Sequence, residues 1–182
     1  MKFLSCLGIG AIVFLFSGCQ KEENSEVDLL PAATQNGTKA FGCLLNGKAF
    51  LPNGNDGNIG GSPYSVVYEP RLYEGLLTIN AFRYTRKGDE NSYQSILLFA
   101  DSVQRPGRFS LSVKRAEEAL FYDAQKPDCR FRARETHYQS GELVLTRVDK
   151  VAGIISGTFH FKLYKPGCDS VIVTEGRFDK KL

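Results

Sequence analysis

Apolar and polar residues alternate along most of the chain after residue 40. In the segment 153–164, GIISGTFHFKLY, the side chains of Ile155 and Phe159 would lie on one face of an extended chain, and those of Thr158 and His160 on the other. A period of two residues is typical of a strand with one buried face. The pattern therefore predicts an all-β domain.

Turn residues divide these segments into roughly nine or ten strands. Asn46-Gly47, inside the segment 41–52, predicts a hairpin with a type I′ turn. Near the C-terminus, short turns join three alternating segments into a predicted antiparallel meander: 141–149, 153–164 and 170–181. Strands of this number and spacing favour a single β-sandwich or a barrel-like domain, and the periodicity does not distinguish the two.

Three other segments have less regular patterns. The run 93–101 is almost entirely apolar, which predicts a central strand buried on both faces. The segment 115–124 allows one helical turn before an extended stretch at 120–122. Basic residues alternate with others in 129–138, which is typical of an exposed edge strand or a loop.

The first 18 residues predict a signal peptide. A basic start is followed by residues 3–16, an apolar run of signal-peptide length that is short for a membrane span. Ser17 and Gly18 then lead into Cys19, which resembles the lipobox of bacterial lipoproteins and predicts cleavage after Gly18 and a lipid on Cys19. Phe16 stands where leucine is commonest in lipoboxes. An ordinary secretory signal with an incidental cysteine, or an uncleaved anchor, is the alternative.

Residues 19–40 would then be the lipidated cysteine and a flexible tether, and residues 41–182 the folded β-domain. Lys21, Glu22 and Glu23 resemble the surface-export signal of Bacteroidota lipoproteins, with an ordinary solvated linker as the alternative. The expected location is the outer membrane, with the domain attached through its N-terminal lipid and exposed at the cell surface. A periplasm-facing domain is the alternative.

The charge balance argues against a nucleic-acid partner. The chain has 23 Lys and Arg against 20 Asp and Glu, and loss of Lys2 with the signal peptide leaves 22 against 20, a net charge of +2. Proteins that bind nucleic acid concentrate basic residues on one face. A nearly neutral chain gives no indication of such a face.

Three cysteines follow Cys19. Cys43 lies in an apolar strand and is expected in the core, whereas Cys129 and Cys168 lie in the polar turns KPDCRF and KPGCDS. An oxidising compartment favours a disulfide between these two, which would close a loop of about 38 residues and contribute roughly 3–4 kcal/mol. A zinc site needs three or four clustered ligands, and the chain has no C-x-x-C pair and only two histidines. We therefore predict no metal and no cofactor.

Two motifs carry a family resemblance. FGCLLNGKAFLP at 41–52 and the ending IISGTFHF…VTEGRFDKK resemble uncharacterised lipoproteins of Bacteroidota. The domain of that family has no known function, so the resemblance implies an envelope location and an all-β fold but assigns no catalytic residue. Both motifs also have a structural interpretation, as a hairpin and as core-facing residues at period two.

No motif of a known catalytic site is present. GIISG at 153–157 differs from G-x-S-x-G, and neither H-E-x-x-H nor G-x-x-x-x-G-K-[ST] occurs. His137 and His160 are expected in solvated positions. We therefore predict no catalytic residues. A binding module is the leading hypothesis, followed by a structural accessory subunit of an envelope complex, with an enzyme third.

Tyrosines in the first half of the domain give a mild indication of a glycan or protein ligand, because their rings suit saccharide and protein surfaces. The tyrosines expected to be exposed near the Gly- and Asn-rich loop 53–63 are Tyr64, Tyr68, Tyr73, Tyr84 and Tyr93. The alternative is that β-proteins are simply rich in tyrosine. Ser102 and Ser170 lie in Asp-Ser-Val triplets that resemble the O-glycosylation signal of Bacteroidota and are candidate modification sites, although such triplets also arise by chance.

Overall fold

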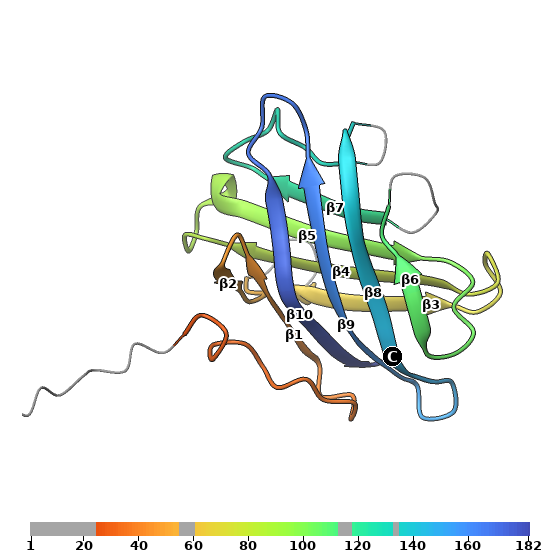
Figure 1. Ribbon diagram of the computed structural model, residues 1–182. Helices are drawn as coiled ribbons and strands as arrows, with labels where there is room; N and C mark the ends of the chain where they lie inside the picture. The colour runs from red at the N-terminus through yellow and green to blue at the C-terminus, as the bar shows by residue number, and fades with distance from the viewer. Residues whose placement is uncertain (1–24, 55–60, 113–117, 133–134) are drawn as a thin grey trace, which may run out of the picture.

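The computed structural model describes residues 25–54, 61–112, 118–132 and 135–182. They contain ten strands and the short 3-10 helix η1 (Glu90–Ser92), and the strands form two antiparallel sheets (Figure 1). The first sheet, in the order β2-β1-β10-β9-β8-β6, consists of β1 (Ala40–Leu45), β2 (Lys48–Phe50), β6 (Gly107–Ser110), β8 (Tyr138–Asp149), β9 (Ile154–Tyr164) and β10 (Val171–Lys181). The second, in the order β3-β4-β5-β7, consists of β3 (Tyr64–Glu69), β4 (Leu76–Tyr84), β5 (Tyr93–Ala100) and β7 (Glu118–Asp123). None of the described residues belongs to a helix long and apolar enough to cross a membrane.

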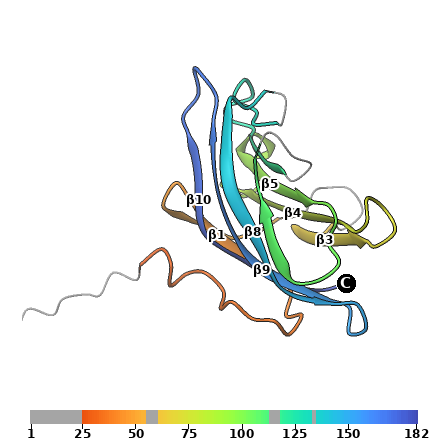
Figure 2. The ribbon, with the colours of Figure 1, turned by 45° about the vertical axis from the view of Figure 1, so that its right-hand side comes forward.

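The two sheets pack face to face as a β-sandwich. In Figure 1 the strands of the first sheet lie in front and cross those of the second sheet behind them, and Figure 2 shows the two layers more nearly edge on. A single core lies between them, with Leu143 and Phe159 from the first sheet and Ile79 and Leu98 from the second. The predicted all-β sandwich is confirmed. The barrel-like alternative is wrong, because the chain forms two separate sheets.

The turn and meander predictions are also confirmed. Asn46 and Gly47 join β1 to β2 with φ angles of 49° and 79°, the left-handed values that a type I′ turn requires. Strands β8, β9 and β10 pair in succession, each antiparallel to the next. Local sequence therefore specifies the β1–β2 hairpin at one edge of the first sheet and the three strands β8, β9 and β10 next to it.

Two glycine–phenylalanine pairs explain the C-terminal motif. Gly157 of β9 lies opposite Phe178 of β10, and Gly176 of β10 lies opposite Phe159 of β9. A Cβ on Gly157 would lie 2.3 Å from the carbonyl oxygen of Val144, and one on Gly176 would lie 2.4 Å from that of Phe159. Because these two glycines have no side chain, there is room in the core for the two phenylalanine rings, each of which is only 2% exposed. The motif residues are therefore determinants of core packing.

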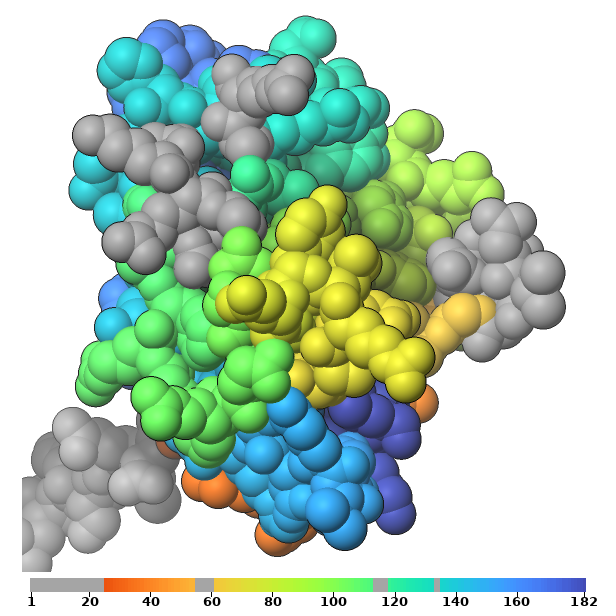
Figure 3. All heavy atoms as spheres, turned by 90° about the vertical axis from the view of Figure 1, so that its right-hand side faces the viewer, coloured from red at the N-terminus to blue at the C-terminus, as the bar shows by residue number. Residues whose placement is uncertain are grey.

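The connection that leaves β5 is fixed against the turn that follows β3. The Tyr68 hydroxyl donates to the Val103 carbonyl at 2.6 Å, and the Val103 N–H donates to the Gly75 carbonyl at 2.9 Å. Figure 3 shows these two segments, yellow and green, lying directly against each other. Because the chain passes here from the second sheet to the first, this contact closes one end of the sandwich.

Strand β5 differs from its prediction. It has one buried face, formed by Ile96, Leu98 and Ala100, while the residues between them are half-buried. The continuous apolar run does not indicate burial on both faces, because the outward side chains of β5 remain partly exposed. This outer face is the one that forms the candidate site.

The segments on either side of residue 125 are extended. Residues 118–123 form strand β7 without the helical turn that the sequence allowed, and 115–117 lie outside the described residues. In the basic segment 129–138, Phe131 forms an isolated bridge with Phe121, and its ring is 2% exposed. This segment is thus mainly a loop that is anchored in the core.

Residues 25–39, which we call the N-terminal strap, pack against the first sheet. Pro31 lies over Gly42 of β1, where an added Cβ would be 2.7 Å from the proline ring. Nearer the start of the strap, the Glu26 carboxylate accepts the Ala49 N–H at 2.8 Å. These contacts hold the strap beside β1 and β2.

Asp179 of β10 fixes the C-terminal end of the strap. Its carboxylate is 1% exposed and accepts the Ser156 hydroxyl at 2.6 Å. It also accepts hydrogen bonds from the Thr34 hydroxyl and from the strap N–H groups of Asn36, Gly37 and Thr38. Burial alone would raise the pKa of Asp179, but these donors outweigh it and hold that pKa well below its usual range. The folded unit therefore extends further toward the N-terminus than the predicted boundary at residue 41.

Candidate functional site

Four aromatic side chains form a continuous strip on the outer face of the second sheet, which we call the aromatic strip: Phe82, Tyr84, Tyr93 and Tyr122. The ring centroid of Tyr93 lies 5.5 Å from that of Phe82, 5.5 Å from that of Tyr84 and 6.1 Å from that of Tyr122. Strands β4, β5 and β7 supply these rings from positions that alternate with their core residues. The strip therefore crosses three neighbouring strands.

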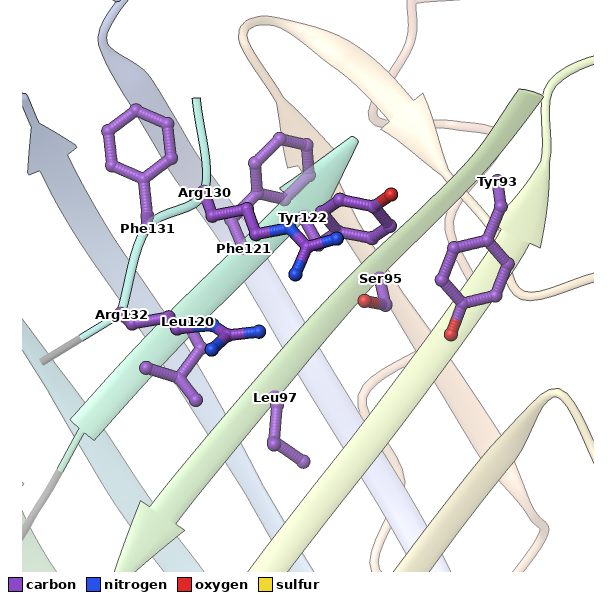
Figure 4. A pocket seen from close by; sticks show the side chains of 9 residues that line it. All are labelled: Tyr93, Ser95, Leu97, Leu120, Phe121, Tyr122, Arg130, Phe131 and Arg132. Atoms are coloured by element: carbon purple, nitrogen blue, oxygen red, sulfur yellow. The ribbon is translucent and has the colours of Figure 1, made fainter. Parts of the chain in front are cut away.

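Two arginines border the strip. The guanidinium carbon of Arg130 lies 4.7 Å from the ring centroid of Tyr122, a cation–π distance. Arg132 extends from the same side of the chain, because Phe131 between them turns into the core. Figure 4 shows both arginine side chains extending from their loop over strand β7. Within the described part of the chain, neither guanidinium forms an ion pair or a hydrogen bond.

The predicted disulfide is confirmed and positions this loop. Cys129, next to Arg130, is bonded to Cys168 in the connection between β9 and β10. The bridge between Phe121 and Phe131 adds two backbone hydrogen bonds, of 3.2 and 3.0 Å. The loop is thus tied to both sheets, and Arg130 is held between a disulfide and a buried ring. The disulfide therefore contributes to the site as well as to stability.

A groove of about 380 Å³ lies beside the strip. Leu97 and Leu120 give it apolar walls, Tyr93 and Tyr122 give it ring surfaces, and Ser95 adds a hydroxyl group (Figure 4). Its described lining residues include the two arginines but no histidine and no carboxylate. The described part of the lining thus offers tyrosine, serine and arginine as its polar side chains. Its chemistry suits binding of a flat, partly apolar ligand with negative charge.

The residues predicted for anchoring and export lie outside the described residues: Gly18, Cys19, Lys21, Glu22 and Glu23. The predictions made for them therefore remain predictions.

The candidate O-glycosylation sites differ in accessibility. Ser102 is exposed and has a φ angle of 54° in the connection after β5. Ser170 is half-buried beside the disulfide, and its carbonyl accepts a hydrogen bond from the Asn46 side chain at 3.3 Å. Ser102 is thus the more accessible of the two.

The two histidines are exposed and lie apart from the groove. His160 lies on the outer face of β9, and His137 precedes β8 with its ring centroid 6.1 Å from that of Tyr164. Cys43 is buried in the core, and burial raises the pKa of its thiol to about 12. No group of three or more His, Cys, Asp and Glu that could hold a metal occurs among the described residues.

The prediction of exposed tyrosines is right for Tyr73, which is 67% exposed, and partly right for Tyr84 and Tyr93, which are half-buried. Tyr84 and Tyr93 belong to the aromatic strip. Tyr64 is 3% exposed and Tyr68 is packed against the core, because period two directs both rings of β3 inward. Tyr73 lies at an exposed turn. The expected cluster is therefore smaller than predicted.

Sequence reasoning missed two rings of the strip, Phe82 and Tyr122, and both arginines, Arg130 and Arg132. One signal was present, since the segment LFYD placed Tyr122 at an outward position once Phe121 was assigned to the core. No local pattern placed Arg130 over that ring, because its position depends on the disulfide and on the Phe131 bridge.

The comparisons with known proteins concern the same region of the chain. They found no matching curated protein and no matching solved structure. One family model matches residues 73–180, which include the aromatic strip, both arginines and both cysteines of the disulfide. This match covers more than half of the 182 residues, and the chain therefore belongs to that family, a domain of unknown function (DUF6252).

Proposed function

We propose that the protein is a lipid-anchored envelope protein whose β-sandwich binds a glycan or protein ligand in the groove beside the aromatic strip. The observation that carries this proposal is the combination of two half-buried rings, Tyr93 and Tyr122, with two arginines that have no acidic partner among the described residues. Aromatic residues and arginine are the types that dominate the energetics of recognition surfaces.

The strap supports a close attachment to the membrane. Because it is bound to the domain from Glu26 onward, only residues 19–25 would separate the lipid on Cys19 from the folded unit. A fully extended chain of that length spans about 24 Å. The predicted tether of residues 19–40 would have reached roughly 70 Å. The proposed anchor therefore keeps the domain close to the lipid surface.

The location that we propose is the outer membrane of a member of the Bacteroidota, with the domain facing outward. The stretch Lys21-Glu22-Glu23 supports export, and the domain of unknown function agrees with the uncharacterised family that the motifs resemble. Ser102, exposed in an Asp-Ser-Val triplet, is the better candidate for O-glycosylation.

The anchor is tested by a Cys19→Ser variant expressed as the full chain. We expect the parent protein to partition with membranes and to release fatty acids on hydrolysis, and the variant to contain no lipid. A variant with the same lipid content as the parent would overturn the lipidation proposal. Accessibility of the domain to protease in intact cells separates an outward-facing protein from a periplasm-facing one.

The groove is tested by screening the detergent-purified protein against an array of glycans and against envelope proteins. For any ligand found, we expect Tyr93→Ala to weaken binding at least tenfold, since a lost stacking contact of about 1.4 kcal/mol has that effect. Tyr73→Ala is the control, because Tyr73 is 67% exposed at a turn and lies outside the strip. Equal affinities for the two variants would place the ligand elsewhere.

A further inference from the structure

We infer that the groove binds an acidic saccharide, a chain of sugar rings that carries carboxylate groups. This inference rests on the proposed function and specifies its ligand. It follows from two features of the groove that call for different parts of one ligand, namely the ring faces of the aromatic strip and the cations beside them.

The ring faces call for a flat surface with apolar C–H groups. Tyr93 and Tyr122 line the groove and are only half-buried, so part of each ring is open to a ligand. Tyrosine rings offer apolar contact area together with a polar hydroxyl group. The C–H face of a pyranose ring matches the first property, and its hydroxyl groups match the second. Leu97 and Leu120 extend the apolar surface to the groove walls.

The arginines call for anions. A guanidinium presents its N–H donors in a planar fork that pairs with a carboxylate through two parallel hydrogen bonds. The Arg130 guanidinium carbon lies 4.7 Å from the Tyr122 ring centroid, and its N–H groups form no hydrogen bond within the described residues, so they are available to a ligand. The one acidic residue of β7 on the same face, Glu118, has a pKa that burial raises, and no arginine contributes to that shift. Neither arginine is therefore neutralised by the described residues of this face.

The spacing of the two cations calls for a repeating anion. Arg130 and Arg132 are two residues apart in an extended segment, so their backbone positions are separated by about 7 Å. This separation is on the scale of one sugar unit in a polysaccharide. One carboxylate per unit would allow each guanidinium to pair with its own anion, whereas a single small anion would engage only one of them.

The experiment compares polygalacturonate oligosaccharides with the same chains after full methyl esterification, which keeps the rings and removes the charge. The full-length protein, purified in detergent, is titrated with each by calorimetry at moderate salt. We expect the acid form to bind at least tenfold more tightly than the ester. We also expect the double variant R130Q/R132Q to remove this preference.

The matched control is the double variant R71Q/R105Q, which removes the same charge from two exposed turn residues outside the groove. We expect this control to change the affinity less than twofold, because its two arginines lie outside the groove. If net charge alone determined binding, both double variants would lose the same affinity. Retention of the parent melting temperature shows that each variant is folded.

Three outcomes would overturn the inference. Binding of acid and ester with equal affinity, still weakened by Tyr93→Ala, would leave the proposed binding module in place and replace the acidic saccharide by a neutral one. Equal binding of polyglutamate would make the ligand an acidic peptide. Absence of binding to all three probes by the folded protein would reject the acidic saccharide, whereas the array screen described above decides the proposed function separately.

Discussion

The outer faces of the two sheets differ in what they present to water. On β9 of the first sheet the outward side chains are exposed and mostly polar: Thr158, His160, Lys162 and Tyr164. On β5 of the second sheet the outward side chains are half-buried and mostly apolar: Tyr93, Ser95, Leu97 and Phe99. The first face has the alternation expected of a solvated sheet. The second face is mostly apolar but only half-buried, and it carries the groove to which we assign the ligand.

Charge separates the two faces as clearly as polarity does. The first sheet also carries a hollow, of about 590 Å³, and it is larger than the groove of the second sheet. Its arginine, Arg177, already donates to the Glu175 carboxylate and to the Glu175 carbonyl, each at 3.0 Å. Arg130 and Arg132 have no such partner among the described residues. The candidate site is therefore identified by its arginines without acidic partners among the described residues, and not by the volume of the hollow.

The largest expected effect comes from cutting the covalent link between the two sheets. We expect the double variant C129A/C168A to lose about 4 kcal/mol of unfolding free energy, because its unfolded chain regains the freedom of a loop closed over a sequence separation of 39. Denaturant unfolding measures this loss. Ligand affinity should fall as well, because the disulfide at Cys129 no longer holds the loop that carries Arg130. Cys43→Ala removes the free thiol and is the control, with an expected cost of about 1 kcal/mol.

A loss of stability with unchanged affinity in the double variant would contradict the role that we assign to the disulfide in holding the arginines. A loss of affinity with unchanged stability would contradict the loop-entropy argument. The two readouts thus separate the two contributions.

The inner face of the first sheet gives the next largest effect. We expect Gly157→Val to destabilise the protein by about 3 kcal/mol, because its Cβ would overlap the Val144 carbonyl and its branches the Phe178 ring. Thr158→Val is the control, since this neighbouring side chain is exposed and a branched residue suits a strand. Thermal and denaturant unfolding provide the measurement. A folded Gly157→Val protein should keep the ligand affinity of the parent, because the change lies on the sheet without the groove.

Asp179 tests how the first sheet uses its outer face. We expect Asp179→Asn to cost about 2–3 kcal/mol, because an amide accepts fewer hydrogen bonds and leaves strap N–H groups without their anion. Hydrogen exchange of residues 25–39 should increase at the same time. Asp169→Asn, which breaks an exposed pair with Lys126, is the control and should change little. An unchanged rate of hydrogen exchange in residues 25–39 would contradict the role of Asp179 in holding the strap against the sheet.

The same carboxylate predicts a dependence on pH. The pKa of Asp179 is lower in the folded protein than its unfolded value of roughly 3.9. The folded state therefore binds fewer protons, and the stabilisation is complete above that value and is lost as the pH falls below it. Unfolding at pH 3 and pH 7 should show a smaller difference in Asp179→Asn than in the parent. An equal difference would assign the acid sensitivity to other groups.

The sequence was sufficient where one local signal determined the structure. Asn46-Gly47 specified its own turn, and the alternation in β9 specified its buried face. It was insufficient where distant residues meet. The strap has no periodic pattern, and the hydrogen bond that holds it joins Thr34 to Asp179, 145 positions apart in the sequence. Arg130 reaches Tyr122 only because a disulfide and a core ring hold its loop. The site was therefore harder to predict than the sheets that support it.

The smallest expected effect provides the sharpest comparison of the two faces, because it changes the same residue type on each. Tyr122 of β7 is half-buried between Tyr93 and Arg130, whereas Tyr164 of β9 is 39% exposed. We expect Tyr122→Ala to lower the unfolding free energy by about 1 kcal/mol through its lost ring and cation–π contacts, and Tyr164→Ala by less than about 0.5 kcal/mol. Denaturant titrations of both variants under identical conditions measure the difference.

The ligand distinguishes the two tyrosines further. Tyr122→Ala should abolish measurable binding to an acidic saccharide, since the variant loses both a stacking surface and the ring that orients Arg130. Tyr164→Ala should bind as the parent does. Tyr122→Phe is the decisive intermediate, because it keeps the ring and removes the hydroxyl group. If the phenyl ring suffices, this variant retains most of the affinity. If it behaves like the alanine variant, the hydroxyl group forms a hydrogen bond to the ligand, and the strip acts as a polar as well as a stacking surface.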